Sequence, residues 1–256
     1  MHFYDQNGVS AHTVIAKNGK ERPTTLADCR KLRLYPSVST VKDVGVGYGL
    51  LGWMHGLLLD TALSNPPSSL GYAGDKWKKE VLKKYSMQKN KAANRGTEIH
   101  GKLDVYYKTG EICKEDKKFI TPAIELIADT FPNRKFNSET SFTHKGEGFG
   151  GCVDLYAEEG IPLIIDFKTK DKNNIAEMKQ YDDHKIQLAA YQGGLQLPEY
   201  TRRFNLFISV NEDTPGECHL IECLQFDKYW EMFLAYLNLW KVKNNYDPTK
   251  EIGGIS

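Results

Sequence analysis

Residues Gly148–Thr169 read GFGGCVDLYAEEGIPLIIDFKT, and this stretch predicts the central hairpin of the fold. The apolar run from Pro162 to Ile165 is typical of a strand buried in a sheet. The sequence Glu158-Glu159-Gly160 before it predicts a tight turn, because glycine adopts a positive φ without strain. Two strands joined by a short turn are therefore expected here.

Three charged side chains are expected to meet at the end of this hairpin. Since side chains alternate between the faces of a strand, Asp166 and Lys168 point the same way, and Asp154 comes opposite Asp166 if the register allows. Carboxylates suit Mg²⁺ or Mn²⁺, and a lysine beside such a metal can orient or deprotonate a water molecule. An ordinary surface Asp/Lys pair remains the alternative, because short charged patterns recur by chance.

Length and composition are those of a soluble globular protein. A chain of 256 residues can bury a full core, as one large domain or as a domain with an elaborate insertion. The net charge of +1 argues against a surface that binds polyanions everywhere. It still allows a nucleic-acid cleft, in which a basic rim surrounds an acidic metal site.

Cysteine usage and hydropathy predict a reduced, cytosolic protein. The five cysteines form no CxxC pair, and Met1-His2-Phe3-Tyr4 does not begin a signal peptide. We therefore expect free thiols in the cytoplasm, which is the host cytoplasm if a phage encodes the chain. The most apolar window, Tyr48–Leu63, is interrupted by glycine, histidine and aspartate, which predicts a buried helix and no membrane span.

The N-terminal part is predicted to be mostly helical after a polar start. Residues 1–35 predict an extended arm or a small hairpin. Ser37, Ser39 and Thr40 follow Pro36 and suit a helix cap near Thr40 or, alternatively, a phosphate contact. Further helices are predicted at 46–63, Asp75–Tyr85, Ala92–Tyr107 and Glu115–Phe131. The lysines of Asp75–Tyr85 indicate either a solvated face or a DNA path, and they are Lys76, Lys78, Lys79, Lys83 and Lys84.

The C-terminal part supplies the other strands of a mixed sheet. A strand at Phe136–His144 contains Glu139, and a helix at Asp183–Leu197 carries Gln187 and Tyr191 on one face. Two antiparallel strands follow at Arg203–Val210 and Glu217–Gln225, and Asp227 is expected to cap a last helix that ends near Asn244. This order predicts an α/β fold with a mixed central sheet flanked by helices.

Four short motifs follow one another along the chain. They are Arg95–His100 (RGTxxH), Gly150–Leu155 (GxxDL), Ile165–Thr169 (DxKT) and Gln187–Tyr191 (QxxxY). In this order they resemble the motifs of the RecB-like exonuclease branch of the PD-(D/E)XK nucleases. Pro36–Thr40 further resembles the PSVTT start of the mitochondrial genome maintenance exonucleases and related phage exonucleases. Each motif alone has low specificity, whereas four in order are specific.

The chain departs from this pattern in two places. No proline precedes Asp154, and the cysteine cluster that holds an iron–sulfur centre in some relatives is absent from the sequence. We therefore expect no iron–sulfur cluster.

The resemblance implies a role for each matched residue. It implies that Asp154, Asp166, the Phe167 carbonyl and His100 hold Mg²⁺ or Mn²⁺, whereas a lone helical histidine is more often structural. It implies that Lys168 positions the attacking water and that Glu139 supports the site or binds a second metal. Gln187 and Tyr191 would support catalysis or contact DNA. The expected phosphate contacts are Ser37, Ser39, Thr40, Arg95, Thr97 and Lys168.

The expected protein is a single nuclease domain that acts on DNA. Residues 1–90 would form a substrate-binding region, 91–225 the nuclease core, and 226–256 a C-terminal helix. We expect a metal-dependent exonuclease for single-stranded or frayed ends in phage replication, recombination or repair, with proteins of those pathways as candidate partners. An endonuclease on the same fold and a non-catalytic DNA-binding protein are the alternatives.

Overall fold

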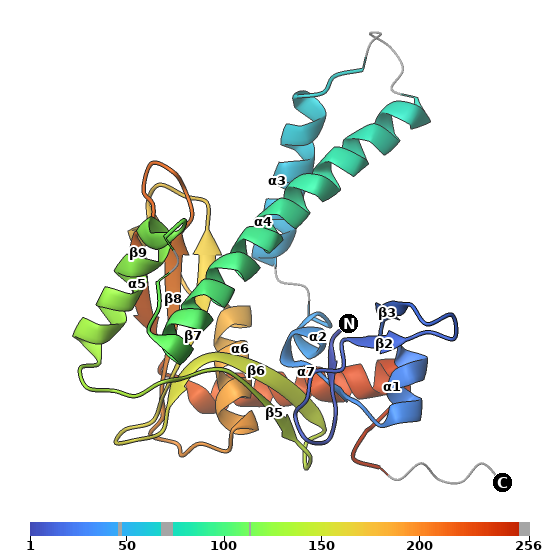
Figure 1. Ribbon diagram of the computed structural model, residues 1–256. Coiled ribbons are helices and arrows are strands. Elements are labelled where there is room, and N and C mark those ends of the chain that lie inside the picture. The colour runs from blue at the N-terminus through green and yellow to red at the C-terminus, as the bar shows by residue number, and fades with distance from the viewer. Residues whose placement is uncertain (46–47, 68–73, 113, 251–256) are drawn as a thin grey trace, which may run out of the picture.

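A five-stranded mixed sheet forms the centre of the molecule (Figure 1). The computed structural model describes residues 1–45, 48–67, 74–112 and 114–250. The strands lie in the order β5-β6-β7-β8-β9, and only β7 and β8 are parallel. Their bounds are β5 Asn137–His144, β6 Phe149–Ala157, β7 Leu163–Lys170, β8 Arg202–Ser209 and β9 Cys218–Glu222. The predicted α/β fold with a mixed central sheet is thus confirmed.

Helices cover both faces of this sheet. The parallel step from β7 to β8 needs a crossover, which the short 3-10 helix Ile175–Glu177 and α6 (Asp182–Gly194) provide. Helices α2 (Val38–Lys42), α6 and α7 (Phe226–Asn244) share one hydrophobic cluster with β5 and β6. The C-terminal part of α4 (Asp75–Thr109) and α5 (Lys117–Thr130) pack on the other side, against β6, β7 and β8.

The first 36 residues form small antiparallel pairs and one helix. Strand β1 (Phe3–Tyr4) pairs with β4 (Tyr35–Pro36), and β2 (Thr13–Ile15) pairs with β3 (Glu21–Pro23). The expected small hairpin is therefore present, and helix α1 (Leu26–Leu32) was not predicted. Helix α2 begins two residues before the predicted position, because Ser37 is its N-cap and accepts a hydrogen bond from the backbone N–H of Thr40.

Helices α3 (Tyr48–Leu63) and α4 form a long antiparallel arm that projects from the sheet (Figure 1). The helix predicted at 46–63 is confirmed over residues 48–63, and residues 46 and 47 lie outside the described residues. The prediction that this helix is buried is wrong. Leu50, Trp53, Leu59 and Leu63 are all exposed. The physical reason is that α3 packs beside α4 on the arm, away from the sheet, so only one side of α3 can be covered.

Helix α4 joins two segments that the sequence predicts as separate helices. The segments Asp75–Tyr85 and Ala92–Tyr107 belong to one helix of 35 residues, which ends at Gly110 with φ 77°. The prediction of two helices is wrong because the linking residues 86–91, SMQKNK, contain no glycine or proline that would end a helix. The predicted boundary between residues 90 and 91 therefore falls inside a helix.

The remaining expectations concern a helix cap, a turn, the cysteines and membrane-spanning helices. Asp227 lies in the first turn of α7, whose N-cap is Gln225, so the predicted cap at Asp227 is wrong by two residues. Gly160 has φ 70° in the turn between β6 and β7, as predicted.

Cys113 lies outside the described residues, and the other four cysteines are free thiols. Within the described chain, no helix has the length and apolar character to cross a bilayer.

Candidate active site

The central hairpin brings Asp154 of β6 next to β7. The pairing of the two strands ends at Leu155 opposite Ile165, one residue before Asp154 and Asp166. Oδ2 of Asp154 accepts a hydrogen bond of 2.7 Å from the backbone N–H of Phe167. Where the two strands stop pairing, the carboxylate thus accepts the backbone N–H bond that a neighbouring strand would otherwise accept. Its second oxygen, Oδ1, is left for other ligands.

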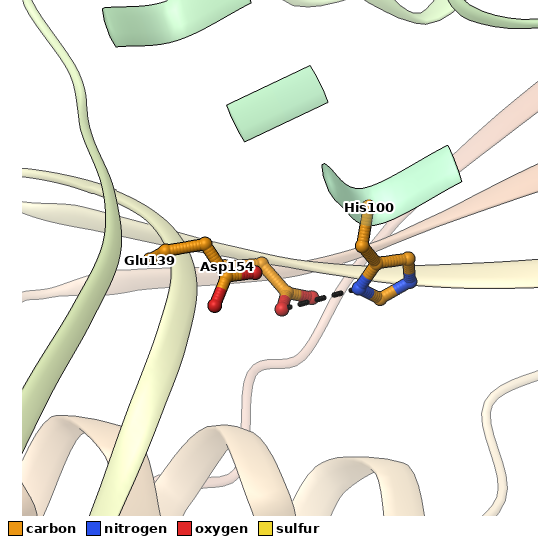
Figure 2. A group of neighbouring side chains, drawn as sticks. All are labelled: His100, Glu139 and Asp154. Carbon is orange, nitrogen blue, oxygen red and sulfur yellow. Dashed lines mark ion pairs between the residues drawn. The ribbon is translucent and has the colours of Figure 1, made fainter. Parts of the chain in front are cut away.

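Three side chains from three elements converge around that oxygen (Figure 2). Nδ1 of His100, on α4, lies 3.3 Å from Oδ1 of Asp154. Glu139 comes from β5, and one ligand atom from each of His100, Glu139 and Asp154 lies within 4.8 Å of the others. Two carboxylates and one imidazole are a donor set that suits Mg²⁺ or, with the nitrogen ligand, Mn²⁺.

Glu139 occupies this position with an unusual backbone. Its φ is 43°, which non-glycine residues rarely adopt. The neighbouring pairs Ser138↔Leu155 and Thr140↔Val153 place Glu139 directly across from Asp154. Oε2 of Glu139 accepts a hydrogen bond of 3.1 Å from the thiol of Cys152. Burial and the nearby Asp154 carboxylate raise the pKa of Glu139, as expected where two carboxylates share a site that a cation can fill.

Asp166 lies deeper than Asp154, inside a hydrogen-bonded network. Its side chain is 1% exposed, and Oδ2 is 2.6 Å from Nζ of Lys168. Asn205 Nδ2 donates to Oδ2 at 2.7 Å, and Gln187 Nε2 donates to Oδ1 at 3.0 Å. Asp166 is not one of the three residues of the compact ligand group, so its role as a metal ligand stays a prediction.

The charges of the site stabilise one another. Burial raises the pKa of Asp166, as does the nearby Asp154, although Lys168 opposes both effects. Burial alone would raise the pKa of Asp154, but His100 and Lys168 outweigh it and the pKa lies below its usual value. Burial alone would lower the pKa of His100 and of Lys168, but the carboxylates raise both. The buried charges are therefore paired with opposite charges.

Gln187 of α6 connects four polar side chains. Its Nε2 donates to Asp166 and, at 2.7 Å, to the hydroxyl of Tyr191. Its Oε1 accepts from Nζ of Lys168 at 3.2 Å and from Nζ of Lys42 at 2.7 Å. Burial raises the pKa of Tyr191 well above its usual value. The structure thus brings together Asp166, Lys168, Gln187 and Tyr191, as the motifs predict.

Two polar residues of the site were not predicted, Lys42 and Asn205. Asn205 is fully buried in β8, and its Oδ1 accepts a hydrogen bond of 3.0 Å from Gln180. A signal for it exists in the sequence, because Asn205 interrupts the apolar run Phe204–Ile208, and a buried amide needs partners. Lys42 has no such signal, since a lysine in the last turn of a capped helix is typical of a surface residue.

The predicted phosphate-contact residues near α2 form a small cluster of hydroxyl side chains. Oγ of Ser37 lies 2.9 Å from Oγ of Ser39 and donates to Oγ1 of Thr40 at 3.0 Å. Thr40 is buried and also accepts from the backbone N–H of His2 at 2.7 Å. Of the three, Ser39 is exposed and lines a groove. The phosphate role of all three stays a prediction.

Arg95 and Thr97, on α4, have protein partners. Arg95 donates to Glu98 at 2.9 Å and to Asp116 at 3.0 Å, and its guanidinium lies over the ring of Phe119. Thr97 is exposed and donates to the carbonyl of Ala93 at 3.2 Å. The structure therefore gives Arg95 a packing role, and a phosphate contact by either residue stays a prediction.

A groove of about 1990 Å³ lies between the helical arm and the sheet and adjoins the site. Trp53 of α3 and Lys91 of α4 line one side, and Thr169, Lys170 and residues of α6 line the other. The described lining contains five basic residues, Lys42, Lys91, Arg95, Lys170 and Lys172. It contains eight acidic ones, Asp43, Asp60, Glu98, Asp171, Asp182, Asp183, Glu212 and Asp213. The five lysines between residues 76 and 84 do not line it.

Comparison with known proteins gives structural similarity only. No family model and no curated protein sequence matches the chain. The structure is similar to that of an alkaline exonuclease from Laribacter hongkongensis, with a TM-score of 0.45 and 13% identity over 82% of this chain and 88% of that one. It is also similar to a phage-related exonuclease from Haemophilus somnus, with a TM-score of 0.36 and 12% identity over 75% and 91% of the chains. Both of these proteins are named as exonucleases.

Proposed function

We propose that this chain is a metal-dependent DNA exonuclease that hydrolyses phosphodiester bonds with Mg²⁺ or Mn²⁺. One observation carries the proposal. The ligand group His100, Glu139 and Asp154 lies beside the Asp166–Lys168 pair, and all of these residues except Glu139 belong to the RGTxxH, GxxDL and DxKT motifs.

In this proposal, His100, Asp154 and Glu139 hold the cation, with Asp166 and the Phe167 carbonyl as further ligands. When bound, the cation lowers the pKa of a water molecule and stabilises charge on the phosphate. Lys168 orients the water or a phosphate oxygen, because its ammonium is fixed between Asp166 and Gln187. Tyr191 holds the amide of Gln187 in the orientation that serves both partners.

The arm and its groove are the proposed substrate-binding region, and a single strand is the proposed substrate. Trp53 is 46% exposed on the groove side of α3, where an aromatic ring can stack on an unpaired base. A duplex presents no free base face for such a contact. Preference for linear single-stranded DNA or frayed ends follows.

The biological setting belongs to the proposal as well. The PSVST segment resembles that of phage exonucleases, and this supports a role in phage DNA replication, recombination or repair in the host cytoplasm. Proteins of those pathways are the proposed partners. Endonuclease activity on the same fold remains the second candidate, since the residues of the site act on a phosphodiester whether or not a free end is near.

One experiment separates these functions. End-labelled linear and covalently closed circular DNA, each single- and double-stranded, is incubated with Mg²⁺ or Mn²⁺, and the products are resolved by length. Release of mononucleotides or short products from linear single strands, with intact circles, supports the exonuclease. Cleavage of circular single strands supports the endonuclease, and binding without cleavage under all conditions supports the non-catalytic protein.

A further inference from the structure

Lys42 is placed at the point where the groove meets the site. It is the last residue of α2, and its Nζ donates a 2.7 Å hydrogen bond to Oε1 of Gln187. The helix that carries it is fixed, because Val38 and Val41 are buried in the hydrophobic core. A bridge between Ser37 and Gly150 also connects the start of α2 to β6. The ammonium group is thus held in one place and is not a mobile surface charge.

The positive charge of Lys42 has no close counter-charge in the part of the chain that the structure describes. No carboxylate oxygen of those residues lies within 4.0 Å of Nζ of Lys42, and among them Gln187 is its one hydrogen-bond partner. An ammonium has three N–H donors, so two remain for a ligand. Burial, followed by the charge of Lys168, lowers the pKa of Lys42 to about 8. This environment favours a bound anion.

The charge of the groove makes each single basic side chain important for binding a phosphate. Its described lining contains more acidic than basic side chains, so no general positive field attracts the DNA backbone there. Arg95, one of the five basic residues of the lining, is already paired with Glu98 and Asp116. Lys42 is the basic residue of the lining that contacts the network of Asp166 and Lys168.

We infer that Lys42 is a further substrate-binding residue, whose ammonium binds a non-bridging oxygen of the phosphate that flanks the cleaved bond. The inference rests on the proposed function. It assigns the flanking phosphate of the substrate to the side of the groove that carries Lys42. Lys168 does not line the groove and serves the cleaved phosphate, whereas Lys42 lines it and reaches the same amide oxygen of Gln187. The two ammonium groups therefore suit adjacent positions along one strand.

The test separates phosphate binding from a role in orienting Gln187. Binding of a fluorescent single-stranded oligonucleotide is measured as a function of salt in the cleavage-defective Asp154→Asn protein. The measurement is repeated after adding Lys42→Gln, Lys42→Arg or, as the control, Lys20→Gln, which removes an exposed lysine outside the groove. Thermal unfolding of each variant shows that it is folded. The Lys42 variants are also made in the active protein to obtain kcat and KM.

We expect Lys42→Gln to reduce the slope of log K against log salt by about 0.7, the value for one lost phosphate contact on a single strand. Lys42→Arg and Lys20→Gln keep the parent slope, and Lys42→Gln raises KM for the oligonucleotide. An unchanged slope in folded Lys42→Gln overturns the inference, and a lower kcat with that unchanged slope shows that Lys42 only orients Gln187. If wild type cleaves no DNA and the Asp154→Asn protein binds none, the proposed function fails, and this inference with it.

Discussion

The carboxylate of Asp154 accepts a 2.7 Å hydrogen bond from the backbone N–H of Phe167, on the neighbouring strand. This bond fixes Oδ2, so that Oδ1 faces His100 at 3.3 Å. The orientation of the candidate ligand is thus set by the backbone of β7, the strand that also carries Asp166 and Lys168. An amide in place of this carboxylate keeps the shape and removes the charge.

Asp154→Asn is expected to abolish stabilisation by Mn²⁺ or Mg²⁺. A metal that binds only the folded state stabilises it by about 2.7 kcal/mol at a hundredfold excess over Kd. For a chain of this size we therefore expect the wild-type melting temperature to rise by roughly 5–10 °C. Differential scanning fluorimetry with and without EDTA measures this shift. Equal shifts in wild type and Asp154→Asn would exclude Asp154 as a ligand.

His100→Ala is expected to weaken metal binding and to change the preferred metal. Imidazole favours Mn²⁺ over Mg²⁺ relative to oxygen ligands, so its loss reduces activation by Mn²⁺ more than activation by Mg²⁺. Metal titrations of the cleavage rate give both apparent affinities. His219→Ala is a matched control, because His219 is a half-buried histidine of β9 outside both the ligand group and the lining of the groove. The same Mn²⁺/Mg²⁺ ratio in His100→Ala as in wild type would contradict the assignment.

Replacement of Asp166 is expected to affect cleavage and folding to different degrees. Asp166→Ala leaves Asn205 Nδ2 without its acceptor and removes one of two acceptors from Gln187 and from Lys168, and a buried unsatisfied group costs about 1–3 kcal/mol. Asp166→Asn and Lys168→Met retain more of the packing. All three variants should lose cleavage by at least about 100-fold, the low end for a lost acid–base or positioning group. Urea unfolding and single-turnover rates separate the effects, and near-wild-type cleavage by Lys168→Met would refute the proposed mechanism.

Lys42→Met is expected to stabilise the protein at neutral pH. The pKa of Lys42 is lowered from 10.5 to about 8, by burial first and by Lys168 second, while Asp183, Asp166 and Asp43 oppose the shift. The unfolded state therefore binds more protons between these pH values, so the destabilising contribution is fully present below about pH 8 and is lost by about pH 10.5.

Because Lys42 is partly exposed, we expect a gain of only about 1 kcal/mol at pH 7, which corresponds to roughly 2–4 °C. Thermal melts at pH 7 and pH 10 measure the difference. Greater stability in a variant with weaker DNA binding would be the behaviour of a residue retained for function. A gain of equal size at both pH values would argue against the lowered pKa as its cause.

Trp53→Ala is expected to weaken binding of single-stranded DNA. Stacking of a base on an aromatic side chain contributes about 1–3 kcal/mol per base. Leu63→Ala removes an apolar side chain that is 78% exposed on the same helix but does not line the groove, and it should bind normally. Fluorescence anisotropy with a poly-dT oligonucleotide compares the two. If both variants bind like wild type, the groove side of α3 does not contact bases.

The sequence predicted those parts of the fold and site that local patterns specify. The hairpin, its turn at Gly160, the mixed sheet and the meeting of Asp166, Lys168, Gln187 and Tyr191 follow from periodicity and short motifs. The length of α4 was missed, because a polar segment such as residues 86–91 favours a helix as readily as a linker. The exposure of α3 was also missed, since an apolar composition does not show which surface will cover a helix.

Residues that act through contacts distant in the sequence were the hardest to predict. Lys42 and Gln187 are separated by 145 positions, and nothing beside Lys42 in the chain indicates that its side chain reaches α6. Glu139 was predicted as a strand residue, but nothing in the neighbouring sequence indicates its positive φ or its place across from Asp154. Such contacts depend on tertiary packing and leave no local signal.

The continuity of α4 has a mechanical consequence. A single helix carries Lys91 on the arm and, nine residues later, His100 beside Asp154. At 1.5 Å per residue, these positions are about 14 Å apart along one rigid rod, and the start of the rod lies roughly 38 Å from His100. Ile99 and Leu103, on either side of His100, are fully buried, so the core holds this end of the rod in place. Whatever binds along the arm is therefore kept at a set distance from the imidazole.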